Sequence, residues 1–236
     1  MNLCKVGLPV SLDNNDFRRL LPFFMAVCIY TIVNSIPSAP LWVKGLSKIL
    51  PLICLCVFIL NHGKDFISKR RRVQRLLLAL LFSAAGDVLL LMNNTKIFIV
   101  GAAMFALAHC LYTWAFGFEP LNMKAGGVIG VAVMLGLTFL STCSTIYQVL
   151  LLCCYCSLIG LMSWRANAPV LFCSHRPPPR VTGAMGAWLF MVSDFVLATN
   201  LLCFTVPFQN PIVMGTYYMA QLFITLGIVK ENEKID

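Results

Sequence analysis

Apolar residues run along this chain in long stretches that short polar connections separate. A helix needs about 20 mostly apolar residues to cross the hydrocarbon of a bilayer, and eight stretches approach that length. We therefore predict an all-α fold, a polytopic membrane helix bundle in which residues 1–236 form a single integral membrane domain. The predicted helices span residues 20–36, 42–60, 73–92, 97–118, 124–140, 145–164, 181–203 and 211–229.

One connection has a distinct composition, because it contains Pro177, Pro178 and Pro179 in succession. Proline lacks a backbone N–H and favours extended polyproline conformations. We expect this segment, between the sixth and seventh predicted helices, to be a stiff extended turn that is not helical.

The composition agrees with a membrane protein. Hydrophobic residues make up 59% of the chain and charged residues 11%, whereas an ordinary soluble domain has about 25% charged residues. The net charge of +9 does not indicate a nucleic-acid partner, because the basic residues are not spread over a folded polar surface. Function is expected inside the membrane or at its surface.

The basic residues indicate an orientation. Eight spans place both termini on one side, and all of the 18 lysines and arginines fall on that side except Lys44, Lys48 and Lys96. The positive-inside rule then predicts cytoplasmic termini. The basic run at residues 69–72 fits an anchor on this side, although such a run can also bind anionic lipid head groups.

The third and seventh predicted helices resemble each other around an aspartate. Residues 86–89 read Gly-Asp-Val-Leu, and residues 193–196 read Ser-Asp-Phe-Val. The next helices share a weaker match between residues 107–109 and 219–221. A parallel repeat of four plus four helices would place the two aspartates at similar depth. Chance similarity between apolar helices is the alternative.

Asp87 and Asp194 are the acidic residues that the predicted helices place well inside the hydrocarbon. A helical rise of about 1.5 Å per residue puts both near 20 Å from the cytoplasmic end. An intramembrane carboxylate is costly and usually faces a cavity where it carries function, although each could simply bond a neighbouring helix. Two carboxylates in one low-dielectric cavity ionise unequally, which would supply a general acid and a general base.

Two lysines in the second predicted helix are further candidates for the site. Lys44 and Lys48 are spaced i, i+4 and therefore share one face. They could snorkel to the interface, pair with the aspartates or bind a phosphate group. Lys48 lies deeper than Lys44 and is the better candidate for a site.

Four further polar residues are candidates for orienting a substrate or the carboxylates. His109 and Tyr112 lie one turn apart in the fourth helix, and Tyr218 and Gln221 lie in the eighth. Each could equally be a packing residue, since a lone histidine in a helix bundle is more often buried than functional.

The 11 cysteines lie mostly within apolar runs. They show neither a paired framework nor the spacing of metal ligands, so we interpret them as small apolar packing residues. We expect no metal and no organic cofactor.

Taken together, the motifs resemble those of the eukaryotic transmembrane lysoplasmalogenases, which are relatives of the bacterial YhhN-type membrane proteins. The resemblance runs from about residue 17 to 229 and is strong because the order and spacing of weak motifs agree. The motifs are residues 44–51, Ser83-Ala84-Ala85-Gly86-Asp87, Ala108-His109-Cys110-Leu111-Tyr112, Ser193-Asp194 and Tyr217-Tyr218-Met219-Ala220-Gln221.

This resemblance implies hydrolysis of the vinyl ether bond of lysoplasmalogens to a fatty aldehyde and glycerophosphoethanolamine or glycerophosphocholine. It also implies that the paired aspartates, Asp87 and Asp194, are catalytic. We hypothesise that one aspartate protonates the β carbon while the other stabilises the cation and activates water. The sequence does not assign the two roles.

A proton-coupled transporter or lipid carrier is the alternative from another class, since buried acids and internal repeats also occur in transporters. The partners we expect are a lysophospholipid and membrane lipid, and homo-oligomerisation is left open. A retained first helix with no cleavable signal suits the endoplasmic reticulum membrane, to which the resemblance also points.

Overall fold

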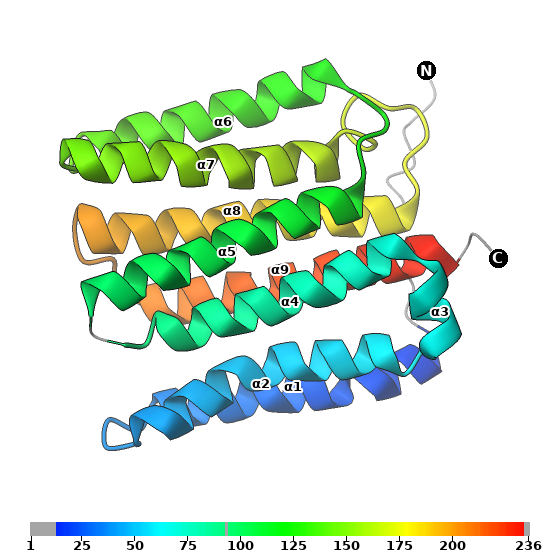
Figure 1. Ribbon diagram of the computed structural model, residues 1–236, viewed down its shortest axis with the longest axis horizontal. Coiled ribbons are helices and arrows are strands. Elements are labelled where there is room, and N and C mark those ends of the chain that lie inside the picture. Colours follow the sequence, from blue (N-terminus) through cyan, green and yellow to red (C-terminus); the bar gives the residue numbers. More distant parts are fainter. Residues whose placement is uncertain (1–12, 93, 234–236) are drawn as a thin grey trace. The chain divides into compact units, whose positions relative to one another are not determined.

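The structure is a computed structural model that describes residues 13–92 and 94–233 (Figure 1). Within these ranges the chain forms helices and no strands. The helices are α1 (Asn14–Asn34), α2 (Leu41–Leu60), α3 (Lys64–Lys69), α4 (Arg71–Leu89), α5 (Thr95–Phe116), α6 (Met123–Ser141), α7 (Ile146–Asn167), α8 (Pro178–Leu202) and α9 (Gln209–Glu233).

The prediction of an all-α membrane protein is confirmed. Among the described residues, six helices are long and apolar enough to cross a membrane, namely α2, α5, α6, α7, α8 and α9. The other two long helices, α1 and α4, carry charged side chains near their starts and fall outside this set. Each of the eight predicted segments overlaps one of the long helices, and the crossing of the membrane by all eight remains a prediction.

The chain divides into two compact units. The first ends at Ala115 and contains α1 to α4 and nearly all of α5, whereas the second begins at Phe116 and contains α6 to α9. In the first unit α2 packs against both α1 and α4, and in the second α8 packs against α7 and α9. The division falls close to the point, between the fourth and fifth predicted helices, where the proposed four-plus-four repeat would divide the chain.

The prediction of an extended turn at the three prolines is wrong for two of them. Pro178 and Pro179 are the first residues of α8, and only Pro177 is extended, with a ψ of 132°. Proline suits the start of a helix because the first-turn N–H groups have no intrahelical partner and because its fixed φ is close to the helical value.

The interpretation of all cysteines as packing residues is also wrong. Cys143, which follows α6, and Cys203, at the end of α8, form a disulfide. The two residues are 60 positions apart, and cysteine connectivity cannot be deduced from spacing alone. In the described part of the chain the other eight cysteines are free, for example Cys153 and Cys154 in α7.

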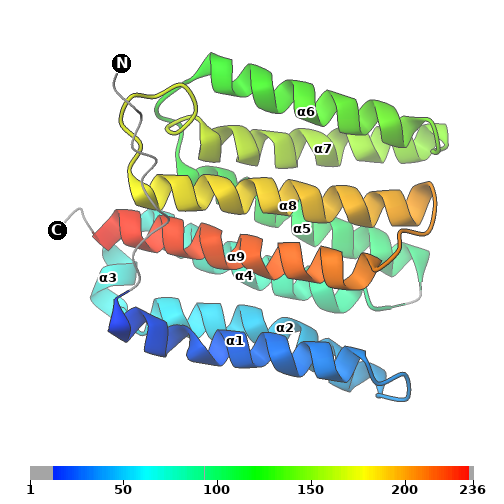
Figure 2. The same cartoon turned by 180° about the vertical axis from the view of Figure 1, so that it is seen from behind.

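Close packing of α8 against α9 fixes the position of the helix that carries Asp194. Both views show the two helices side by side (Figure 2). A Cβ atom added to Gly227 would lie 2.7 Å from the backbone nitrogen of Gly183, and one added to Gly186 would lie 2.8 Å from the backbone nitrogen of Ile224. Small residues permit this approach of membrane helices.

Candidate functional site

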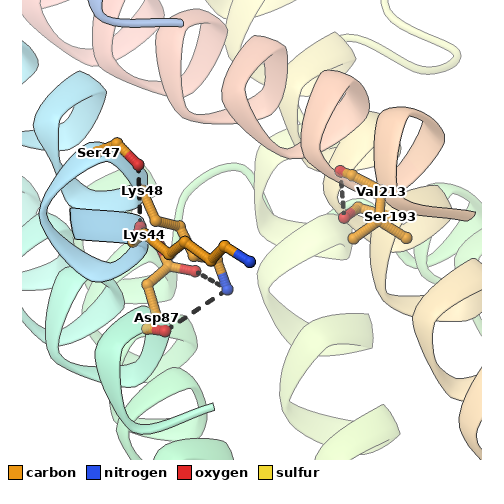
Figure 3. Close-up of polar contacts among 6 residues, drawn as sticks. All are labelled: Lys44, Ser47, Lys48, Asp87, Ser193 and Val213. Carbon is orange, nitrogen blue, oxygen red and sulfur yellow. Dashed lines mark hydrogen bonds and ion pairs between the residues drawn. The ribbon is translucent and has the colours of Figure 1, made fainter. Parts of the chain in front are cut away.

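In the first unit, Lys48 of α2 forms an ion pair with Asp87 of α4 (Figure 3). The Lys48 Nζ atom lies 3.1 Å from Asp87 Oδ1 and 3.5 Å from the Asp87 carbonyl oxygen. Only 3% of the Asp87 side chain and 12% of the Lys48 side chain are exposed. A buried charge is very costly without a partner, so this pair explains how α2 and α4 accommodate both residues.

Lys44 has a different role from Lys48. Both side chains extend from the same face of α2 (Figure 3), as the i, i+4 spacing predicts. The Lys44 Nζ atom, however, donates to the Pro37 carbonyl oxygen at 3.3 Å, in the connection before the helix. The Lys44 side chain therefore links the start of α2 to the preceding connection.

Tyr112 of α5 lies against the part of α4 that leads to Asp87. Its hydroxyl oxygen is 3.5 Å from Ser83 Oγ, and Ser83 precedes Asp87 by one turn. His109 is one turn before Tyr112 and is fully buried, as Tyr112 is. The first unit thus gathers Lys48, Asp87 and Tyr112 in one region, while His109 lies in the adjoining turn of α5.

In the second unit, Tyr155 of α7 holds the other aspartate. The Tyr155 hydroxyl donates a hydrogen bond to Asp194 Oδ2 at 2.7 Å. Sequence analysis did not select Tyr155, because tyrosines are common in membrane helices. The proposed repeat could have indicated it, since repeat symmetry maps α7 onto α2 and the aspartate of each unit contacts a side chain from the preceding long helix.

Asp194 and Tyr155 lie on the wall of a groove formed by α6, α7 and α8. The groove has a cavity volume of about 310 Å³. Its other walls are predominantly apolar, with Val133 and Leu137 from α6, Leu152 from α7 and Met191 from α8. Among the described residues that line it, Asp194 is the only acidic one. The groove therefore combines an apolar slot with a carboxylate that a neighbouring helix holds in place.

The predicted residues of α9 are deeply buried. Gln221 has no exposed surface and Tyr218 only 2%. The nearby Ser193 Oγ donates to the Val213 carbonyl oxygen at 3.0 Å (Figure 3), which connects α9 to the residue that precedes Asp194. A role of Tyr218 and Gln221 in orienting a substrate remains a prediction.

Comparison with known proteins identifies the family. The model of the YhhN family matches residues 43–228 of the chain. The chain belongs to the YhhN family. Among curated proteins similar to this YhhN chain is human lysoplasmalogenase TMEM86A, which is 35% identical over 229 residues that cover 97% of this chain and 95% of that protein. Human lysoplasmalogenase TMEM86B is 34% identical over 219 residues, covering 90% of this chain and 87% of that protein.

A rat relative gives a similar result. Rat lysoplasmalogenase TMEM86B is 32% identical to this YhhN chain over 221 residues, covering 90% of the chain and 84% of that protein. No solved structure matches the chain.

The YhhN match includes every candidate residue considered above, from Lys44 to Gln221. Asp87 belongs to the first unit and Asp194 to the second, and their action at one shared site remains a prediction. Within residues 13–92 and 94–233, no group of three or more His, Cys, Asp or Glu side chains is arranged to hold a metal ion.

Proposed function

We propose that this protein is a lysoplasmalogenase, a hydrolase that cleaves the vinyl ether bond of a lysoplasmalogen. One observation carries the proposal. The relatives named lysoplasmalogenase match almost the whole chain, and almost the whole of each relative, at 30–35% identity. An agreement of this extent includes all the helices that hold the candidate residues.

The chemistry of the bond fits a pair of carboxyl groups. Protonation of the β carbon of a vinyl ether gives an oxocarbenium ion, water adds to that ion, and the resulting hemiacetal collapses to an aldehyde and an alcohol. A general acid must deliver the first proton, and a base must take a proton from the water. We assign these two tasks to Asp87 and Asp194, without assigning either task to one of them.

The geometry gives two other side chains a positioning role. Lys48 forms an ion pair with Asp87, and this supports a role in holding that carboxylate rather than in binding the lipid phosphate. Tyr155 donates to Asp194 and so restricts the rotation of its carboxyl group. Groups held in place by neighbours are what a preorganised site requires.

The proposed location is the endoplasmic reticulum membrane, with both termini in the cytoplasm. In this orientation α6 and α8 both end on the lumenal side, where Cys143 and Cys203 form their disulfide. Disulfides persist in oxidising compartments such as the endoplasmic reticulum lumen. The disulfide therefore supports the proposed orientation.

The proposal is tested by aldehyde release from detergent-purified protein given a lysoplasmalogen, with the saturated alkyl-ether analogue as the substrate control. Asp87→Asn and Asp194→Asn should each reduce turnover by at least about 100-fold, because an amide neither donates an acidic proton nor accepts one. Asp65→Asn, on the exposed helix α3, is the matched control and should retain full activity.

Two outcomes contradict these assignments. Near-normal turnover in both aspartate variants would exclude acid–base catalysis by this pair. Absence of aldehyde from well-folded protein that binds or transports the lipid would instead support a transporter or lipid carrier, because flux needs no bond cleavage.

A further inference from the structure

The groove between α6, α7 and α8 has the dimensions and walls of a binding site for one lipid chain. Its volume of about 310 Å³ falls within the range of about 300–1,000 Å³ that is typical of small-molecule sites. The Leu137, Leu152 and Met191 side chains that line it offer no hydrogen bonds to a polar ligand. An aliphatic chain suits such walls, because it makes van der Waals contacts with them and has no polar group that needs a hydrogen bond.

The position of Asp194 distinguishes this groove from an ordinary lipid-facing crevice. A carboxyl group inside the hydrocarbon is costly, and here Tyr155 holds it at the groove wall with a hydrogen bond of 2.7 Å. In a lysoplasmalogen the vinyl ether is the part of the alkenyl chain that joins the glycerol. A chain lying in the groove therefore brings its reactive end within range of a wall that carries one of the two candidate acids.

We propose that this groove binds the alkenyl chain of the lysoplasmalogen, with the vinyl ether at Asp194, and that Gly136 keeps the groove open for long chains. The inference rests on the proposed function and adds the chain site and the determinant of chain length. Other lipid chains of the bilayer are competing occupants.

A substitution at Gly136 would fill part of the groove without distorting α6. It lies in α6 and lines the groove, and a Cβ atom added there would lie 3.5 Å from the Phe195 ring, an ordinary van der Waals contact. A leucine at this position would occupy space that the chain needs. Gly130, in the same helix, does not line the groove, and a Cβ atom added to it would meet nothing within 4 Å. Gly130→Leu is therefore the matched control.

The first experiment measures kcat and KM for a long-chain and a short-chain lysoplasmalogen in the wild type and in both glycine variants. Gly136→Leu should raise KM for the long chain several-fold, because the leucine occupies groove volume and removes van der Waals contacts between the walls and the chain. The short chain should be affected little, and Gly130→Leu should match the wild type for both substrates.

The outcomes separate this inference from the proposed function. If the wild type is active and Gly136→Leu has the same kcat and KM as the wild type for both substrates, the groove is not the chain site. The hydrolase assignment would still stand. If the well-folded wild type releases no aldehyde from either substrate, the proposed function fails and this inference fails with it.

A second experiment uses only the wild-type protein, so its result does not depend on whether a variant folds. The wild type is photolabelled with an alkyl-ether lysophospholipid that carries a diazirine along its chain, and the labelled residues are identified by mass spectrometry. Labels at Leu152 and Met191 that excess lysoplasmalogen removes would support the inference. Labels at exposed side chains such as Met134 and Leu151, unaffected by the competitor, would overturn it, since they indicate contact with any bilayer chain.

Discussion

The two aspartates have different partners at the scale of single residues. Asp87 is paired with the ammonium group of Lys48, whereas Asp194 accepts a hydrogen bond from the neutral Tyr155 hydroxyl. Two carboxyl groups with different tasks need different surroundings, as in enzymes that run acid and base chemistry at one pH. The unlike partners therefore agree with a division of labour between the aspartates.

Tyr155→Phe tests the positioning of Asp194. The change keeps the ring and removes the hydroxyl that donates to the carboxyl group, and a hydrogen bond of this kind contributes about 0.5–1.5 kcal/mol. We expect kcat to fall by about threefold to tenfold with KM almost unchanged, measured as aldehyde release. The control is Tyr147→Phe in the same helix, where the side chain is exposed. Equal kcat in the two variants would show that the hydroxyl does not serve the reaction.

The sequence alone selected the aspartates and Lys48 as candidates, because charged residues within apolar helices are rare and conspicuous. It was not sufficient to select Tyr155, since a tyrosine in such a helix usually packs or faces the interface. Whether its hydroxyl reaches a carboxyl group depends on the rotation of α7 relative to α8. That rotation comes from packing, which the apolar pattern of a weakly amphipathic helix does not specify.

At the scale of helices, the ion pair between α2 and α4 is a specific contact within the first unit. Replacing only one partner leaves the other charge buried and typically lowers the stability by about 3–5 kcal/mol. Replacing both partners leaves no unpaired buried charge and avoids this loss. The pair therefore holds the two helices in one register.

Lys48→Met should lower the thermal unfolding midpoint of the detergent-solubilised protein, and the double variant Lys48→Met/Asp87→Asn should recover most of the loss. The reason is that the methionine leaves Asp87 without its ammonium partner, while the added asparagine removes the buried charge. Lys44→Met is the control, since Lys44 bonds only a carbonyl group in a connection. The idea fails if Lys48→Met unfolds at the same temperature as the control.

Helix positions followed from the apolar stretches to within a few residues at most ends. The largest difference is at the start of α1, which begins at Asn14 where the prediction began at residue 20, because the residues in between include charged side chains. Other differences lie where local chemistry competes with hydropathy. Pro178 and Pro179 begin α8 because a helix start tolerates proline, and α3 is too short and polar for a membrane-based search to find. The groove could not be predicted at all, since it arises from how three apolar helices meet.

At the scale of the whole chain, the division into two units agrees with the proposed repeat. Each unit has one of the two candidate aspartates on its third long helix, and in each unit a side chain of the second long helix contacts that aspartate. The residue pattern predicted that the two aspartates occupy equivalent positions in the two units. The sequence analysis did not pair Lys48 with Tyr155, because a lysine and a tyrosine are chemically unlike, although the repeat relates α2 to α7.

The disulfide belongs to the second unit alone and should stabilise it. Cys143→Ser should lower the stability of the protein by about 2–4 kcal/mol, because the bond restricts the unfolded chain between two distant residues. Thermal unfolding under non-reducing conditions provides the measurement, and Cys154→Ser, which removes a free cysteine, provides the control. Equal unfolding temperatures for the two variants would contradict the prediction.

The contact between Gly183 and Gly227 limits how this family can diverge. The backbones of α8 and α9 are in contact there. Even one added methyl group would therefore push α8, which carries Asp194, away from α9. Mutations can accumulate with little penalty on the exposed sides of both helices, where one apolar residue replaces another. At these two glycines nearly every mutation is a disadvantage, and we expect lineages to retain them long after the surrounding residues have changed.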